Sequence, residues 1–189
     1  MNERGHTLLE MVFVLGLILL MASLLIPGLR AYSQEAHLLG AAEKFCGQFR
    51  EAYSMAVKQN VNTAIRFETG GTTYSLYADG NGNGVLSADI AKGRDRRVAG
   101  PFELSGGAAD VRVGINPGVP AIPPDSGTLD PADPIRFGAS NMLSFSPLGT
   151  ATPGTFYLAG EGAQAAVRVT PGSARVRILF CRSRHWAVR

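Results

Sequence analysis

A nearly unbroken apolar run near the N-terminus is the feature that most constrains this chain. Residues 11–26, MVFVLGLILLMASLLI, carry no charged side chain, and with Leu8 and Leu9 the run approaches the roughly 20 residues that a membrane-spanning helix needs. A secretory signal peptide would normally end in a small-residue cleavage site. Here the small pair Ala22 and Ser23 is followed by more leucine. The run therefore favours a retained membrane helix over a removable signal.

The residues just before this run resemble a known processing signal. Residues 5–10, GHTLLE, followed by an apolar stretch, resemble the class III signal of type IV prepilins and of the pseudopilins of type II secretion. In that family a membrane peptidase cuts after a glycine, the new N-terminus is methylated, and the fifth mature residue is Glu. The resemblance implies cleavage between Gly5 and His6, methylation of His6, and assembly roles for Glu10 and for Pro27, which matches a helix-bending proline. The first mature residue is usually Phe, whereas here it is His6.

Glu10 has a physical role in such an assembly. A carboxylate inside the hydrocarbon region costs on the order of 2.5–3.5 kcal/mol, so an intramembrane acid is by default a candidate for a function. When subunits pack helix against helix, the amine of one mature chain can neutralise the Glu10 carboxylate of its neighbour and set the axial register. The alternative is a Glu at the membrane boundary whose side chain reaches the polar region.

A second helical pattern follows Pro27. Apolar residues recur at three- and four-residue spacing, which predicts an amphipathic continuation of the membrane helix packed on a sheet and ending near Asn60 or Asn62. Those apolar residues are Leu38, Ala42, Phe45, Phe49, Ala52 and Ala56. Beyond them apolar and polar residues alternate, as at Ile65 and Phe67, and glycine and proline become frequent, which predicts short strands joined by loops.

The expected fold is therefore α+β and type IV pilin-like, with a long N-terminal α-helix, its first half transmembrane, packed on a β-rich globular head of antiparallel sheets. The expected segments are a leader over 1–5, a transmembrane and assembly helix over 6–27, an amphipathic helix over 28–62, and the head over 63–189.

Two segments of the head narrow the resemblance. Residues 39–67 and 145–158 are similar to parts of the type II secretion protein H pseudopilins and of the FimT minor pilins. The proline-rich stretch over residues 100–140, with its prolines concentrated between Pro117 and Pro134, is expected to be an extended surface loop, for which a variable insertion is favoured over a partner-binding role.

Residues 79–84, DGNGNG, match the opening of an EF-hand calcium loop, with oxygen side chains at alternate positions and Gly sixth. The candidate ligands are Asp79, Asn81, Asn83, Ser87 and Asp89. The twelfth residue, however, is Ile90, and Asp89 comes one position early, with Asp95 as a substitute. A turn between two strands explains the same residues without calcium, because Gly and Asn tolerate positive φ.

The end of the chain is basic. Six arginines and no acid follow Glu161, and arginine beside an aromatic residue suits phosphate contact and base stacking. The segment Cys181-Arg182-Ser183-Arg184, followed by Trp186, resembles the Gly-Arg-x-Arg motif through which some FimT-like pilins take up DNA, although the glycine is missing. An acidic protein partner and a solvated strand edge are the alternatives.

Cys46 and Cys181 are the only cysteines. Outside the cytoplasm they can form a disulfide that pins the last strand to the helix and contributes about 2–4 kcal/mol. Two separate buried thiols are the alternative.

An enzyme is not expected, because the three histidines are isolated and no phosphate loop or nucleophile motif occurs. The expected function is that of a minor pseudopilin in an inner-membrane, single-pass topology, with its head in the periplasm or another extracytoplasmic space. The resemblance implies as partners other pseudopilin or pilin subunits, prepilin peptidase and the inner-membrane assembly platform, with secreted cargo as a further candidate. A FimT-like minor pilin that primes pilus assembly or binds DNA is the alternative. Apart from calcium at the Asp79 loop, no cofactor is expected.

Overall fold

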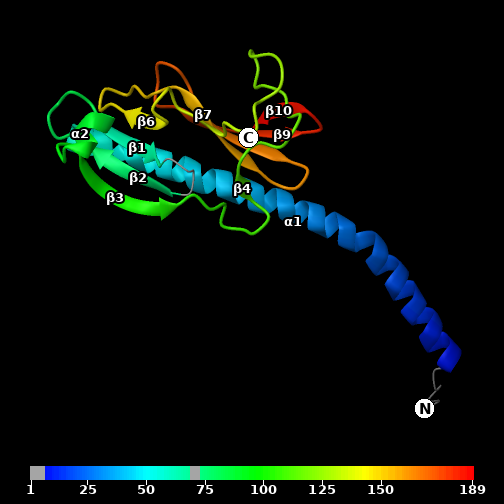
Figure 1. Cartoon of the computed structure of the whole chain (residues 1–189). Helices are drawn as coiled ribbons and strands as arrows, with labels where there is room; N and C mark the ends of the chain where they lie inside the picture. The colour runs from blue at the N-terminus through cyan, green and yellow to red at the C-terminus, as the bar shows by residue number, and fades with distance from the viewer. Residues whose placement is uncertain (1–6, 69–72) are drawn as a thin grey trace.

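The computed structural model describes residues 7–68 and 73–189. One helix, α1, runs without interruption over Leu8–Gln59. Thr7 caps its start, where the Thr7 Oγ1 accepts a hydrogen bond from the Glu10 N–H at 3.3 Å, and Asn60 ends it with a left-handed φ of 53°. The predicted helix end near Asn60 is therefore confirmed, and the two expected helical segments form one element, which Figure 1 shows extending far beyond the head.

The rest of the chain forms two antiparallel sheets, so the predicted α+β fold is confirmed. The first has the order β3-β2-β1-β6 and the second the order β10-β9-β8-β7-β4, with β5 also paired to β7. The first sheet contains β1 (Thr63–Phe67), β2 (Thr73–Ala78), β3 (Arg96–Glu103) and β6 (Met142–Phe145). The second contains β4 (Arg112–Val113), β5 (Ile135–Arg136), β7 (Gly154–Ala159), β8 (Gln164–Val169), β9 (Val176–Arg182) and β10 (His185–Val188). A short helix, α2 (Ser87–Ala91), lies between β2 and β3.

The second half of α1 supplies the centre of the core. Its predicted apolar stripe is fully buried, with every member at 1% exposure or less: Leu38, Ala42, Phe45, Phe49, Ala52 and Ala56. The Phe45 ring lies 4.6 Å from that of Phe156 in β7, and the Phe49 ring lies 5.9 Å from that of Phe137. The helix is thus the shared core of both sheets.

The proline-rich stretch is not the purely surface loop that its composition predicts. Ile115, Ile122 and Leu129 are buried in a second, smaller cluster with residues of β7, β8 and β9. This cluster lies on the face of the second sheet that points away from α1. Burial of these aliphatic side chains, rather than the prolines alone, fixes the path of the segment, because apolar burial is worth about 25 cal/mol per Å².

A buried amide ties the same segment to the sheet. Gln164 is 1% exposed; its Oε1 accepts from the Asn116 N–H at 2.9 Å, and its Nε2 donates to the Gly114 carbonyl at 2.8 Å. Asn116 in turn donates to the carbonyl oxygens of Gly160 and Ala163. The polar groups inside this joint are therefore satisfied by one another.

Replacement of Gln164 by leucine should test this joint. The substitution keeps the side-chain size but leaves a buried N–H and a buried carbonyl unpaired, so the free energy of unfolding should fall by about 2–4 kcal/mol. Urea denaturation of the full chain in detergent measures the change, with exposed Gln59→Leu as the control. An equal, small effect of the two substitutions would contradict the role given to Gln164.

Candidate functional site

The first half of α1 stands clear of the head. All of its large apolar side chains between Leu8 and Leu29 are exposed, by 46–83%, and the helix is long and apolar enough to cross a membrane. At 1.5 Å per residue, 22 residues span about 33 Å, which matches a hydrocarbon core of about 30 Å. Arg30 is the first charged residue after Glu10, and Tyr32 is 76% exposed just beyond it. The apolar part therefore ends one turn before the head begins.

The predicted assembly residues lie at the two ends of this apolar part. Glu10 is in the first turn of α1, and Pro27 is inside the continuous helix. Since proline has no N–H, one helical hydrogen bond is missing there, and Figure 1 shows that α1 curves along its projecting part. Thr7 and Glu10 also have the spacing of a capping box, a local signal that the sequence interpretation did not use. Gly5, with the rest of the predicted leader, and the predicted first mature residue His6 lie outside the described residues.

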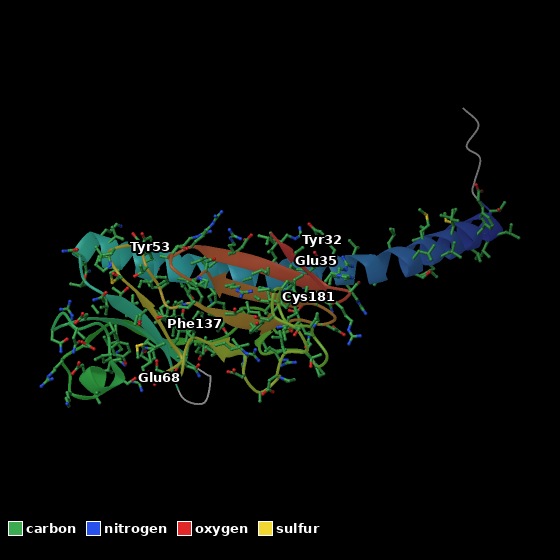
Figure 2. The ribbon with its side chains drawn as sticks, turned by 90° about the horizontal axis from the view of Figure 1, so that it is seen from above. Tyr32, Glu35, Tyr53, Glu68, Phe137 and Cys181 are labelled. Atoms are coloured by element: carbon green, nitrogen blue, oxygen red, sulfur yellow. The ribbon has the colours of Figure 1, made fainter. Side chains whose placement is uncertain are left out.

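Three polar contacts attach the head to α1 just after Tyr32, and the sequence interpretation missed all of them. The Gln34 amide donates to the Glu161 carboxylate. The Glu35 carboxylate accepts from Arg182 at 3.1 Å and from Arg189 at 2.9 Å. Figure 2 shows Tyr32 and Glu35 where the helix leaves the head.

The third of these contacts joins His37 to Asp110, with 3.1 Å between His37 Nδ1 and Asp110 Oδ1. All three contacts join residues more than 70 positions apart in the chain, which is why local patterns do not reveal them.

The predicted DNA or partner residues do not share one surface. Arg182 faces α1 through Glu35, whereas Trp186 packs in the cluster on the opposite face, with its Nε1–H donated to the Pro120 carbonyl at 2.9 Å. The Arg184 guanidinium donates to the Gly118 carbonyl at 3.4 Å. Trp186 and Arg184 therefore lie along the same segment, whereas Arg182 lies on the other face of the sheet.

Arg182 precedes a tight turn, and Arg184 is part of it. Ser183 and Arg184 join β9 to β10 with φ values of 51° and 66°. Two successive left-handed residues are typical of a type I′ hairpin turn, in which Asn and Gly are preferred. Ser183 and Arg184 are neither Asn nor Gly, so their left-handed backbone conformations strain the turn.

The Asp79 loop closes on itself. Asp79 accepts hydrogen bonds from the N–H groups of Asn81, Gly82 and Gly84, and the amide nitrogens of Asn81 and Asn83 both donate to Asp89. Ser87 is exposed at the start of α2. Among the residues that the structure describes, no group of three or more His, Cys, Asp or Glu side chains is arranged to hold a metal ion. The loop is therefore a self-bonded turn in this structure, and calcium binding at these residues stays a prediction.

The same hydrogen bonds set the acidity of the loop. Burial would raise the pKa of Asp79, but hydrogen bonds from the Asn62 amide and from three backbone N–H groups outweigh it and hold the pKa below its usual value. Hydrogen bonding from the Asn83 amide, with that from Asn81 and the charge of Arg94, also lowers the pKa of Asp89. Both carboxylates are thus stabilised in the charged form.

The predicted disulfide is not present, because Cys46 and Cys181 are free, buried thiols. Their positions explain why. Phe180 and Arg182 of β9 face α1, and since side chains alternate along a strand, Cys181 points to the other face of the sheet. Cys46 is on α1 and contributes to the core between the helix and the sheet. Burial raises the pKa of both thiols.

Comparison with models of known protein families, with curated proteins and with solved structures finds no significant match to this chain. The architecture consistent with a pilin-like chain, an apolar N-terminal helix and a β-rich head, therefore rests on the structure itself.

Acid should destabilise the head through the Asp79 loop. The pKa values of Asp79 and Asp89 are lower in the folded chain than in the unfolded chain. The two carboxylates therefore stabilise the fold fully above the unfolded pKa of about 4, and this stabilisation is lost as the pH falls through the folded pKa. We expect the melting midpoint to drop between about pH 5 and pH 3, and to drop less in Asp79→Asn. Thermal melts followed by circular dichroism across this pH range measure the drop for the wild type, for Asp79→Asn and for Asp125→Asn, which is the control at an exposed aspartate. Identical pH profiles for all three proteins would contradict it.

Glycine at position 183 should relieve the hairpin strain. Ser183→Gly is expected to raise the free energy of unfolding by about 1 kcal/mol and the melting midpoint by about 2–4 °C. Ser173→Gly, at a turn residue outside the set with positive φ, should give no gain. A fall in stability for Ser183→Gly would show that the turn is not type I′ in solution.

Proposed function

We propose that this chain is a type IV pilin-like subunit, specifically a minor pseudopilin of a type II secretion system. In this proposal the apolar half of α1 is held in the inner membrane with the head on the extracytoplasmic side. Prepilin peptidase removes the leader between Gly5 and His6, and the assembly platform then moves the subunit into the pseudopilus tip. The chain works by assembly rather than by catalysis.

The observation that carries the proposal is the division of one continuous helix into two unlike halves. The second half buries one apolar stripe against both sheets, while the first half exposes apolar side chains along more than five turns. An apolar surface of this extent is not stable in water. It requires lipid or neighbouring helices, and a subunit that leaves a membrane to enter a helical bundle meets both in turn.

Glu10 is the residue on which assembly should depend. Removal of one partner of a buried ion pair costs about 3–5 kcal/mol, so Glu10→Ala should enter the membrane normally but appear in sheared filaments at least about tenfold less often. Immunoblots of membrane and filament fractions from cells that express the other subunits measure both steps. Glu43→Ala, an exposed glutamate in the packed half of the same helix, is the control.

Equal incorporation of the Glu10 and Glu43 variants would contradict the proposed pairing. A loss of the Glu10 variant from the membrane fraction would instead show that Glu10 acts in insertion.

A FimT-like minor pilin, which primes a type IV pilus or binds DNA, is the alternative function. The separation of Arg182 from Trp186 across the second sheet favours assembly over DNA capture by that motif. A gel shift with single- and double-stranded DNA, with Arg182→Ala/Arg184→Ala as the control, distinguishes the two. DNA binding that the double substitution abolishes would support the alternative.

A further inference from the structure

A large cleft in the described part of the head lies at the end from which α1 emerges. It has a volume of about 870 Å³, and its lining includes Asp110, Arg112, Glu161 and Arg184. Figure 1 shows the β7–β8 turn, in orange, and the β9–β10 turn, in red, at the end of the head nearest the projecting helix. Two of the lining residues contact α1 directly, Glu161 through Gln34 and Asp110 through His37. These contacts fix where the cleft lies along the axis of α1, that is, its height above the apolar part of the helix.

That height coincides with the expected membrane surface. Gln34 and His37 come four and seven residues after Arg30, which places them about 6 Å and 11 Å beyond the end of the apolar part at 1.5 Å per residue. The polar layer on each side of a bilayer is roughly 5–8 Å thick. The wall of the cleft therefore stands at the level of the lipid headgroups or immediately above it.

The cleft presents two cations at its rim. The Arg112 guanidinium donates to the Asn116 Oδ1 at 3.2 Å and the Arg184 guanidinium to the Gly118 carbonyl at 3.4 Å, so both groups lie along residues 114–118. Neither arginine forms an ion pair with any residue that the structure describes. Each guanidinium has five N–H donors, which leaves most of them available to an oxyanion.

The acids of the cleft point toward α1 and form no ion pair with these two arginines. Asp110 is turned to His37 and Glu161 to Gln34, both on α1. Nearby, Glu35 is shared by Arg182 and Arg189, so that triad also keeps one positive charge. The cleft and the Glu35 triad together hold four arginines against three carboxylates: Arg112, Arg182, Arg184 and Arg189 against Glu35, Asp110 and Glu161.

We infer that this cleft binds the phosphate-bearing headgroup of an anionic phospholipid, with Arg112 and Arg184 as the phosphate ligands. The inference rests on the proposed membrane span, because only the span brings the cleft to the headgroup layer. Arginine suits the site because its planar donors match phosphate oxygens, and basic residues beside a membrane helix favour anionic lipid. Binding would hold the head down on the membrane before assembly.

Lipid selectivity in nanodiscs tests the inference on the full chain. The chain is reconstituted in equal parts phosphatidylcholine and phosphatidylglycerol, and native mass spectrometry counts the lipids that stay bound. The wild type should retain at least about three times as much phosphatidylglycerol as phosphatidylcholine, and Arg112→Ala/Arg184→Ala should abolish that preference. Arg96→Ala/Arg97→Ala, at the start of β3 near α2, is the matched control and should keep it.

A second measurement separates a lipid site from a loss of folding or a free-anion site. Amide hydrogen exchange over residues 112–118 and 183–186 should be slower in phosphatidylglycerol nanodiscs than in phosphatidylcholine nanodiscs, for the wild type and the control but not for the Arg112/Arg184 variant. Equal exchange in the buried strands β7 and β8 of all three proteins confirms that each is folded. Inorganic phosphate added to phosphatidylcholine nanodiscs should give no protection.

Three results would overturn the inference. They are equal lipid retention by the Arg112/Arg184 variant and the wild type, no preference in the wild type, and protection by inorganic phosphate alone. In each case the chain still inserts, so the proposed membrane span stands. Failure of the chain to enter nanodiscs at all would overturn the span and the inference together.

Discussion

Everything in the head depends on one line of side chains along the second half of α1. Phe45 touches Tyr74 of the first sheet at a ring separation of 6.1 Å and Phe156 of the second at 4.6 Å. Phe49 likewise contacts Phe67 and Phe156. Each sheet uses the same helix as the other layer of its core, so the two sheets are joined through α1. Loss of the helix would leave both sheets with an uncovered apolar face.

The helix can serve the head only because its sequence changes character partway along. Between Glu10 and Arg30 its large side chains are apolar on all sides, as suits lipid or a helical bundle, whereas after Tyr32 the apolar residues narrow to a stripe. The polar residues between these two parts meet the head, with Gln34 and Glu35 bonded to the second sheet and its turns. The change from the exposed apolar part of α1 to the part packed on the head thus takes only about one turn of helix.

The features that the sequence predicted correctly are those encoded by neighbouring residues. The helical stripe and the alternating strands show their periods over a few residues, so the helix end at Asn60 and the α+β fold could be foreseen. Contacts across long separations could not, such as that of Glu35 with Arg182, because they depend on strand register and turn shape. The expected disulfide failed for the same reason: spacing says nothing of the sheet face to which Cys181 points.

The sequence was limited in the same way at the Asp79 loop, where the contacts are closer together in the chain. The residue types at 79–84 suit a calcium loop and a self-bonded turn equally well, and the sequence alone could not place the backbone N–H groups that surround Asp79 in the structure.

Mechanically, α1 is a lever arm. From Glu35 to Gln59 it measures about 36 Å at 1.5 Å per residue, and the head is fixed along that length. In the proposed membrane-anchored state, a change of about 20° in helix tilt, equal to the average tilt of transmembrane helices, would move the far end of the head by roughly 12 Å. Small rotations of the apolar half of α1 would therefore move the Asp79 loop by a distance comparable to the width of a helix.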